Sequence, residues 1–142
     1  MSLARMAGGA SLGVALLILG FPGILYSIGL LRVHGRPTPA STADFPSVDI
    51  AVNWQRCGER LPLEVEPLNP WGVAGRLLWG THRQKNAGET AAWQVARAHN
   101  LAHPVGTMGW WHLSGSALTI WITRHWSAEE IGATLARDNL CK

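Results

Sequence analysis

The chain has few charged residues and lacks the short motifs that mark most common enzyme chemistries. Only 15% of its 142 residues are charged, and its 12 lysines and arginines are scattered, so the net charge of +3 forms no basic block. A nucleic-acid partner is therefore not expected, because proteins that bind nucleic acid gather Lys and Arg on one surface. A glycine-rich phosphate loop, a nucleophile elbow and a Cys-x-x-Cys motif are also missing. No cofactor is expected.

Aromatic residues other than tryptophan are scarce. The chain has one tyrosine and two phenylalanines but eight tryptophans, all of which follow residue 50. Tryptophan has an apolar body and a polar tip, which suits a membrane or protein interface. It also buries much area in a small core, and the sequence leaves both interpretations open.

The longest apolar run lies near the N-terminus, where residues 6–31 form 26 residues without a charge between Arg5 and Arg32. About 20 apolar residues in a helix cross the roughly 30 Å hydrocarbon core of a bilayer. The run therefore predicts a retained transmembrane helix within an N-terminal anchor, residues 1–34. The alternative is a cleaved signal peptide, whose apolar region usually has only about 7–15 residues. Arginines flank the run on both sides, so charge alone does not set its orientation.

Gly9 and Gly13 in this run have the spacing of a helix-packing motif. Small residues four apart let a second helix approach closely within lipid. We therefore expect Gly9 and Gly13 to pack against an integral membrane partner.

The two cysteines, Cys57 and Cys141, lie near the two ends of the predicted C-terminal domain, residues 48–142. In an oxidising compartment they would form a disulfide, which the chain-entropy model values at about 4 kcal/mol; the alternative is two unrelated buried thiols. His99 and His103 have the i, i+4 spacing of a metal pair, but no third ligand accompanies them and no metal site is predicted.

Three helices are predicted in this domain from start signals and apolar spacing. The first covers residues 71–79, behind the N-cap and N1 proline of Asn69-Pro70. The second covers residues 90–103, with a predicted buried stripe of Ala91, Val95, Ala98 and Ala102. The third starts at the capping box Ser127-Ala-Glu-Glu130 and runs toward residue 138.

Other segments give weaker signals. Residues 35–47 are rich in Pro, Ser and Thr and predict a linker. Residues 105–115 are punctuated by glycine and predict a turn, whereas residues 48–54 and 116–125 fit either a strand or a helix.

Three partial motifs follow one another in the domain. Asn69-Pro-Trp-Gly-Val-Ala-Gly-Arg76 is similar to a D-x-x-G-x-x-R-A segment, and Ala87-Gly-Glu-Thr-Ala-Ala-Trp-Gln-Val-Ala-Arg97 follows G-x-S-T-I-T-x-Q-L-A-[KR]. Trp121-Ile-Thr-Arg-His-Trp-Ser-Ala-Glu-Glu-Ile131 is similar to L-E-R-x-[LY]-S-K-[DE]-E-I-L. Together they resemble the peptidoglycan glycosyltransferase (transglycosylase) domain of class A penicillin-binding proteins and monofunctional transglycosylases, over about residues 55–138.

This resemblance implies a mainly α, lysozyme-like domain on the outer, periplasmic face of a bacterial inner membrane, anchored by one N-terminal helix. It also favours a helix over residues 116–125. Glu59 is the nearest match to the family's catalytic glutamate, one position away from the expected place. Thr90, Gln94 and Arg97 match substrate-binding positions of the second motif.

The departures from the family pattern concern its chemistry. The serine of the S-T pair is Glu89, whose carboxylate would repel a pyrophosphate. The basic R-K-x-x-E motif, expected near residues 111–115, is absent, and the lysine of the third motif is Ala128. Transfer from a lipid pyrophosphate needs a positioned base and cations for the leaving diphosphate, so these losses favour a catalytically degenerate domain.

We therefore expect a membrane accessory or scaffold subunit of a larger membrane or envelope complex, in contact with the bilayer and an integral membrane protein. The alternative is a minimal glycosyltransferase, or a glycan-binding protein, that acts on lipid II or peptidoglycan. An enzyme of this kind would have a cleft lined by Glu59, Thr90, Gln94 and Arg97.

Overall fold

The computed structural model describes residues 19–79 and 85–141, and these residues are mainly helical, as the sequence predicts. They contain no strand. A helix covers residues 19–32, and the elements that follow are the 3-10 turn η1 (Thr42–Asp44) and the helices α2 (Ser47–Arg56), α3 (Pro70–Trp79), α4 (Glu89–Ala102), α5 (Met108–His125) and α6 (Ala128–Asp138).

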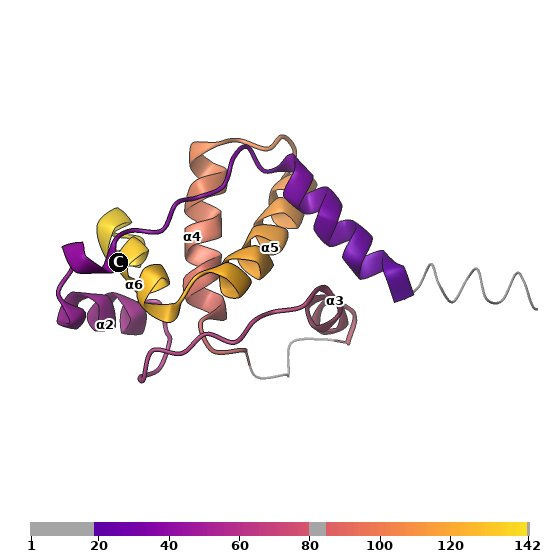
Figure 1. Cartoon of the computed structure of the whole chain (residues 1–142). Helices are drawn as coiled ribbons and strands as arrows, with labels where there is room; N and C mark the ends of the chain where they lie inside the picture. Colours follow the sequence, from indigo (N-terminus) through magenta and orange to yellow (C-terminus); the bar gives the residue numbers. More distant parts are fainter. Residues whose placement is uncertain (1–18, 80–84, 142) are drawn as a thin grey trace, which may run out of the picture.

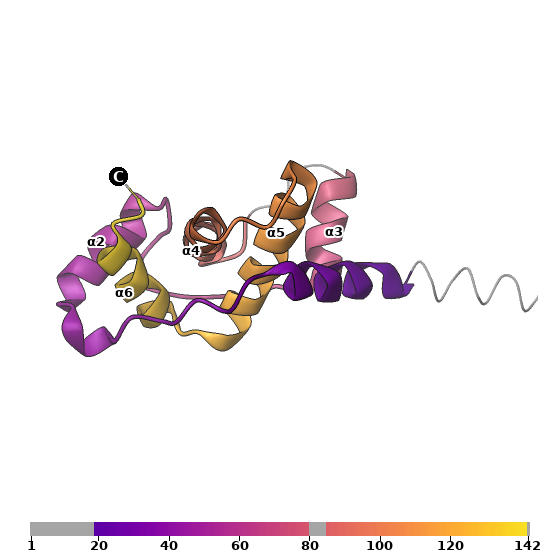
Figure 2. The same ribbon diagram turned by 90° about the horizontal axis from the view of Figure 1, so that it is seen from above.

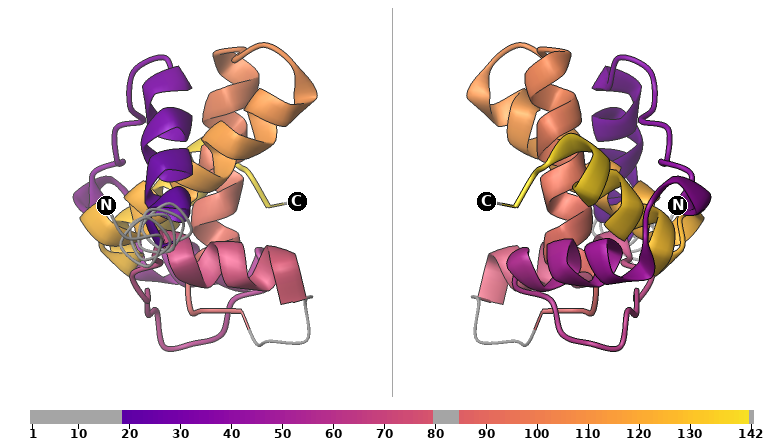
Figure 3. Two further views of the ribbon diagram at one scale, coloured as in Figure 1. Left: turned by 90° about the vertical axis from the view of Figure 1, so that its right-hand side faces the viewer. Right: turned by 90° about the vertical axis from the view of Figure 1, so that its left-hand side faces the viewer.

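Helix α4 packs between α5 and α6, and α2 packs on the other side of α6 (Figures 1 and 2). The core between these helices is built from large apolar side chains with no exposed surface, such as Trp54 of α2, Leu118 and Ile122 of α5, and Ile131 of α6. The N-terminal helix and α3 lie at the opposite end of the molecule from α2 (Figures 1 and 2). Figure 3, left, views the molecule from that end and shows both in front.

The two predicted helix-start signals are confirmed. At α3, the Asn69 side chain accepts a hydrogen bond from the backbone N–H of Gly72 at 2.6 Å. At α6, Ser127 and Glu130 form the reciprocal capping box, with distances of 3.1 and 2.7 Å. Both signals depend only on neighbouring residues, so they can be read from the sequence.

The turn predicted for residues 105–115 is wrong from Met108 onward, where α5 begins. Gly106 does lie in a bend, with a φ of 99°, but Gly109 and Gly115 lie within the helix. A Cβ at Gly115 would lie 2.9 Å from the Trp93 ring, so glycine there lets α4 and α5 approach closely. The segments left open as strand or helix, residues 48–54 and 116–125, lie within α2 and α5 and are helical.

The stripe predicted for α4 is partly wrong. Ala91 and Val95 are buried, but Ala98 is only half-buried and Ala102 is exposed. The buried face is instead completed by Ala92, Ala96 and Asn100. Because α4 has neighbours on two sides, its buried face is wider than a single stripe.

Residues 35–47, predicted as a linker, lie along the folded domain (Figure 1). The buried Ala40 donates its N–H to the Thr134 hydroxyl at 2.9 Å, and the Arg137 guanidinium donates to the Thr38 carbonyl at 3.5 Å. This segment therefore joins the N-terminal helix to the domain through contacts with α6.

The predicted transmembrane helix is described only from residue 19 onward. Residues 6–18, with Gly9 and Gly13, lie outside the described residues. Within the described ranges no helix is long and apolar enough to cross a membrane. The part that is described packs on the domain: a Cβ at Gly29 would lie 2.7 Å from the Ala117 Cβ of α5.

Candidate functional site

Glu59 lies in an open cleft of about 750 Å³ between the loop that follows α2 and the start of α4. Gly58 turns the chain out of α2 with a φ of 83°, a value that favours glycine. Thr90, in the first turn of α4, lines the same cleft.

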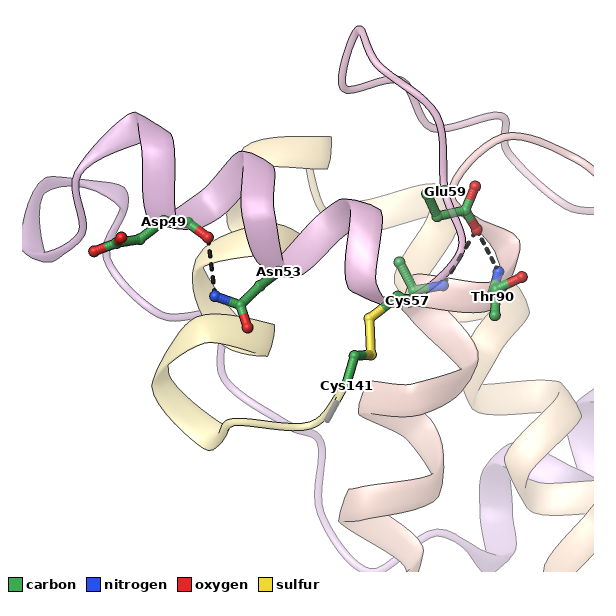
Figure 4. Close-up of a disulfide and its surroundings, with 7 residues drawn as sticks. Asp49, Asn53, Cys57, Glu59, Thr90 and Cys141 are labelled. Carbon is green, nitrogen blue, oxygen red and sulfur yellow. Dashed lines mark hydrogen bonds between the residues drawn. A yellow bond between two sulfur atoms is a disulfide. The ribbon is translucent and has the colours of Figure 1, made fainter.

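Both carboxylate oxygens of Glu59 bind the N-terminus of α4, and Figure 4 shows the bonds of one of them, including that from Thr90. One accepts the backbone N–H of Thr90 at 2.8 Å and that of Ala91 at 3.3 Å, and the other accepts the N–H of Gly88 at 3.1 Å. The first N–H groups of a helix have no partner within the helix, and an acceptor there also interacts favourably with the helix dipole. Glu59 thus caps α4 from the loop that follows α2. The N-cap residue, Gly88, has no side chain that could accept these N–H groups.

The second charged group of the site is an ion pair between Arg76 of α3 and Glu89 of α4, at 2.7 Å. Arg76 also donates to the Asn86 side chain at 2.8 Å, and Glu89 accepts the Asn86 backbone N–H at 3.2 Å. Both charged side chains are mostly buried. The guanidinium of Arg76 is therefore neutralised by the carboxylate of Glu89.

Of the four side chains predicted to line one cleft, Glu59 and Thr90 lie together and Gln94 and Arg97 do not line it. Gln94 and Arg97 follow Thr90 by one and two turns of α4, a rise of about 6 and 10 Å. Arg97 is exposed.

The described charges that line the cleft do not favour a diphosphate. Among the described residues, Glu59, Glu64 and Glu66 line it together with Arg60 and Lys85. An anionic leaving group is stabilised by cations or a metal aimed at it. In the part of the cleft that the structure describes, acidic side chains instead outnumber basic ones.

The paired histidines of α4 form no metal centre in the described residues, where no cluster of three metal-ligating side chains occurs. His99 and His103 stack at 4.5 Å between ring centroids, and each ring binds a backbone carbonyl at 3.1 Å, of His34 and of His99 respectively. Burial lowers the pKa of His99 below 6.5; the bond to His34 partly opposes this, and the charges of His103 and Arg36 add to it.

The expected disulfide joins Cys57, at the end of α2, to Cys141, with 5.1 Å between their Cα atoms (Figure 4). Both residues are buried against the core. The bond ties the last described residue to the loop that carries Glu59.

Sequence reasoning missed an apolar pocket of about 360 Å³ at the other end of the molecule. The N-terminal helix, α3 and α5 line it, with contributions from the residues Pro22, Leu25, Tyr26, Pro70, Val73, Ala74, Leu113, Ala117 and Ile120. The first three of these share one helix face with Gly29, at spacings of three and four residues. This spacing was the available signal, but in a run predicted to lie in lipid the sequence assigned a packing face only to Gly9 and Gly13, as a contact with a membrane partner.

A smaller pocket, of about 130 Å³, lies between the charged cleft at Glu59 and the apolar pocket. It shares Lys85 and Thr90 with the charged cleft, and Val73 and Ser116 with the apolar pocket. Polar and apolar cavities therefore follow one another across α3, α4 and α5.

Comparison of the chain with protein-family models, with curated proteins and with solved structures found no match. The resemblance to transglycosylases, and the lysozyme-like fold that it implies, therefore rest on the three motifs.

Proposed function

We propose that this protein is a membrane-attached accessory or scaffold subunit whose C-terminal domain is a catalytically degenerate relative of the peptidoglycan transglycosylases. It would act on the periplasmic face of a bacterial inner membrane, in a larger membrane or envelope complex. The observation that carries the proposal is the bonding of Glu59. Its two carboxylate oxygens accept three backbone N–H groups, so the residue nearest to the family's general base serves to cap a helix.

The ion pair of Arg76 and Glu89 supports the same conclusion. A free guanidinium next to a hydroxyl would suit a diphosphate, whereas a paired guanidinium next to a carboxylate does not. Separating a mostly buried ion pair leaves each charge uncompensated, which costs free energy. We therefore expect Arg76 to stay bound to Glu89 and not to be free to bind a diphosphate.

A lipid II polymerisation assay tests the loss of activity. The full chain, purified in detergent, is incubated with lipid II and a divalent cation beside an active transglycosylase. We expect glycan polymer only in the positive control. Polymer formed by the chain itself, and lost in Glu59→Gln but retained in Glu64→Gln, would refute the proposal; Glu64 is exposed and is the matched carboxylate in the same cleft.

A second candidate function, binding of a lipid-linked glycan without turnover, is favoured by the succession of polar and apolar cavities. An amphiphile could place its polar group in the cleft and its chain in the apolar pocket. Saturable binding of lipid II without product would support this candidate over a scaffold. Placing a larger side chain in the pocket, with Ala74→Phe, should then weaken binding.

A further inference from the structure

The N-terminal helix presents an exposed apolar face formed by Phe21, Ile24, Ile28 and Leu31, which recur at spacings of three and four residues. Leu19, the first residue of the described helix, is also exposed but lies on another side of it. Leu31 is 84% exposed and Phe21 57%. Ser27, an exposed polar residue of the same helix, donates its hydroxyl to the Gly23 carbonyl at 2.9 Å, so its O–H group needs no hydrogen bond from water. A contiguous exposed face of this kind marks a surface that another apolar phase covers.

Trp71 of α3 adds a second exposed apolar surface next to the first turns of this helix. The residue is 51% exposed, and its ring lies against Gly23, where a Cβ would be 3.4 Å away. Its indole N–H donates to the Leu19 carbonyl at 2.7 Å. The polar tip is therefore satisfied within the protein, and what Trp71 exposes is apolar.

The described helix is the final part of the apolar run that predicts the membrane span. That run covers residues 6–31, and a span needs about 20 apolar residues to cross the roughly 30 Å hydrocarbon core. Trp71 contacts the first described turns of this helix, at Leu19 and Gly23.

Charged groups mark where the helix leaves the apolar layer. Arg32 follows the exposed face and stacks on the Trp110 ring, 4.5 Å from its centroid, while Arg36 lies over Trp121 at 5.6 Å. Arginine and tryptophan together are typical of the membrane–water interface. From Gly23, which Trp71 contacts, to Arg32 the helix rises about 13 Å, enough to pass from the hydrocarbon edge through the headgroup layer.

From these observations we infer that the bilayer covers the face of residues 19–31 and the start of α3, so that the domain is partly embedded and Trp71 lies at the edge of the hydrocarbon. This inference rests on the proposed membrane attachment and adds a surface and its occupant, the lipid. The N-terminal helix, which packs on the domain, would then attach the domain to the membrane directly. The domain would be held at a fixed depth, with α2 facing water.

Spin labels measure the depth of this face. The full chain, with one added cysteine, is labelled with a nitroxide and reconstituted in phosphatidylcholine–phosphatidylglycerol vesicles; the native cysteines are joined in the disulfide and do not react. Trp71→Cys reports the inferred face, and Val48→Cys, equally apolar and 63% exposed on α2, is the matched control. We expect the label at position 71 to collide with oxygen several-fold more than with a water-soluble nickel chelate, and the label at 48 to show the reverse.

A second measurement keeps Trp71 in place. In a chain labelled with fluorotryptophan, the ¹⁹F resonance that disappears in Trp71→Phe is identified as Trp71. Lipids with a nitroxide on the acyl chain should broaden this resonance and leave that of the buried Trp54 unchanged.

Three other outcomes would overturn the inference. A nickel-accessible label at position 71, in a chain that floats with vesicles, would place the domain above the membrane and leave the attachment intact. A label shielded from both reagents would mean that protein covers the face, either a second copy or a partner helix. A chain that does not float with vesicles at all would refute the membrane attachment as well.

Discussion

Breaking the disulfide between Cys57 and Cys141 should cost this protein a large part of its stability. The two cysteines are 84 positions apart, so the bond closes almost the whole described domain into one loop. For a loop of that length the chain-entropy model gives about 4.5 kcal/mol at 25 °C. Small domains have a free energy of unfolding of about 5–15 kcal/mol, so the reduced chain should be marginally stable.

The expected effect lies in the unfolded state, because the two cysteines are buried against helices that pack without the bond. Helices α2 and α6 contact each other along their length, with Ile50 of α2 against Gly132 of α6. Reduction should therefore leave the helical content unchanged in the absence of denaturant and shift the unfolding midpoint to much lower urea.

The assay is urea unfolding of the full chain in detergent, followed by tryptophan fluorescence with and without reductant. The double variant Cys57→Ala/Cys141→Ala, insensitive to reductant, is the control for side-chain effects. A loss below about 1 kcal/mol would refute the reasoning, since it would mean that the unfolded chain already holds residues 57 and 141 close together.

Three further predictions concern single contacts. Glu59→Gln should lower the free energy of unfolding by about 1–2 kcal/mol in urea melts, because an amide replaces one of the two oxygens that accept N–H groups of α4, whereas Glu64→Gln should have almost no effect. Gly29→Ala should lower the melting temperature because its Cβ meets α5, at a typical cost of about 1–3 kcal/mol, whereas Gly20→Ala, with open space around it, should not. The folded state lowers the pKa of His99, so the unfolded state binds protons more readily, and stability should be full above pH 6.5 and fall as the pH drops below it. His99→Gln should flatten that slope in melting temperatures measured from pH 7.5 to 5; an unchanged slope would contradict the assignment.

Features that depend on neighbouring residues were predictable from the sequence. The N-cap at Asn69 and the capping box at Ser127 place the starts of α3 and α6 because each signal lies within four residues. The features that could not be predicted depend on tertiary contacts. From the sequence, Gly115 is interpreted as a turn residue. In the structure it lies within α5, where the ring of Trp93 on α4 leaves no room for a Cβ.

The N-terminal run shows the same limit at a larger scale. Hydropathy treats residues 6–31 as one apolar segment, and it gives no reason to separate one face of residues 19–31 from another. The structure divides the described part into a face with Gly29, which packs on α5, and a face with Phe21 and Ile24, which does not. The contacts of Gly29 with α5 and of Leu19 with Trp71 show that the domain packs on residues of the predicted anchor.

The candidate site shows why residue identity alone does not determine function. A glutamate can serve as a catalytic base or can stabilise the fold, and its hydrogen-bond partners distinguish the two roles. The carboxylate of Glu59 accepts N–H groups at the start of α4, whose N-cap is glycine and offers no side-chain acceptor. Likewise, a carboxylate at Glu89 would be unfavourable beside a diphosphate but is favourable beside Arg76 once no diphosphate is bound. The two glutamates are therefore mutually consistent: each carboxylate is engaged in contacts that stabilise the fold.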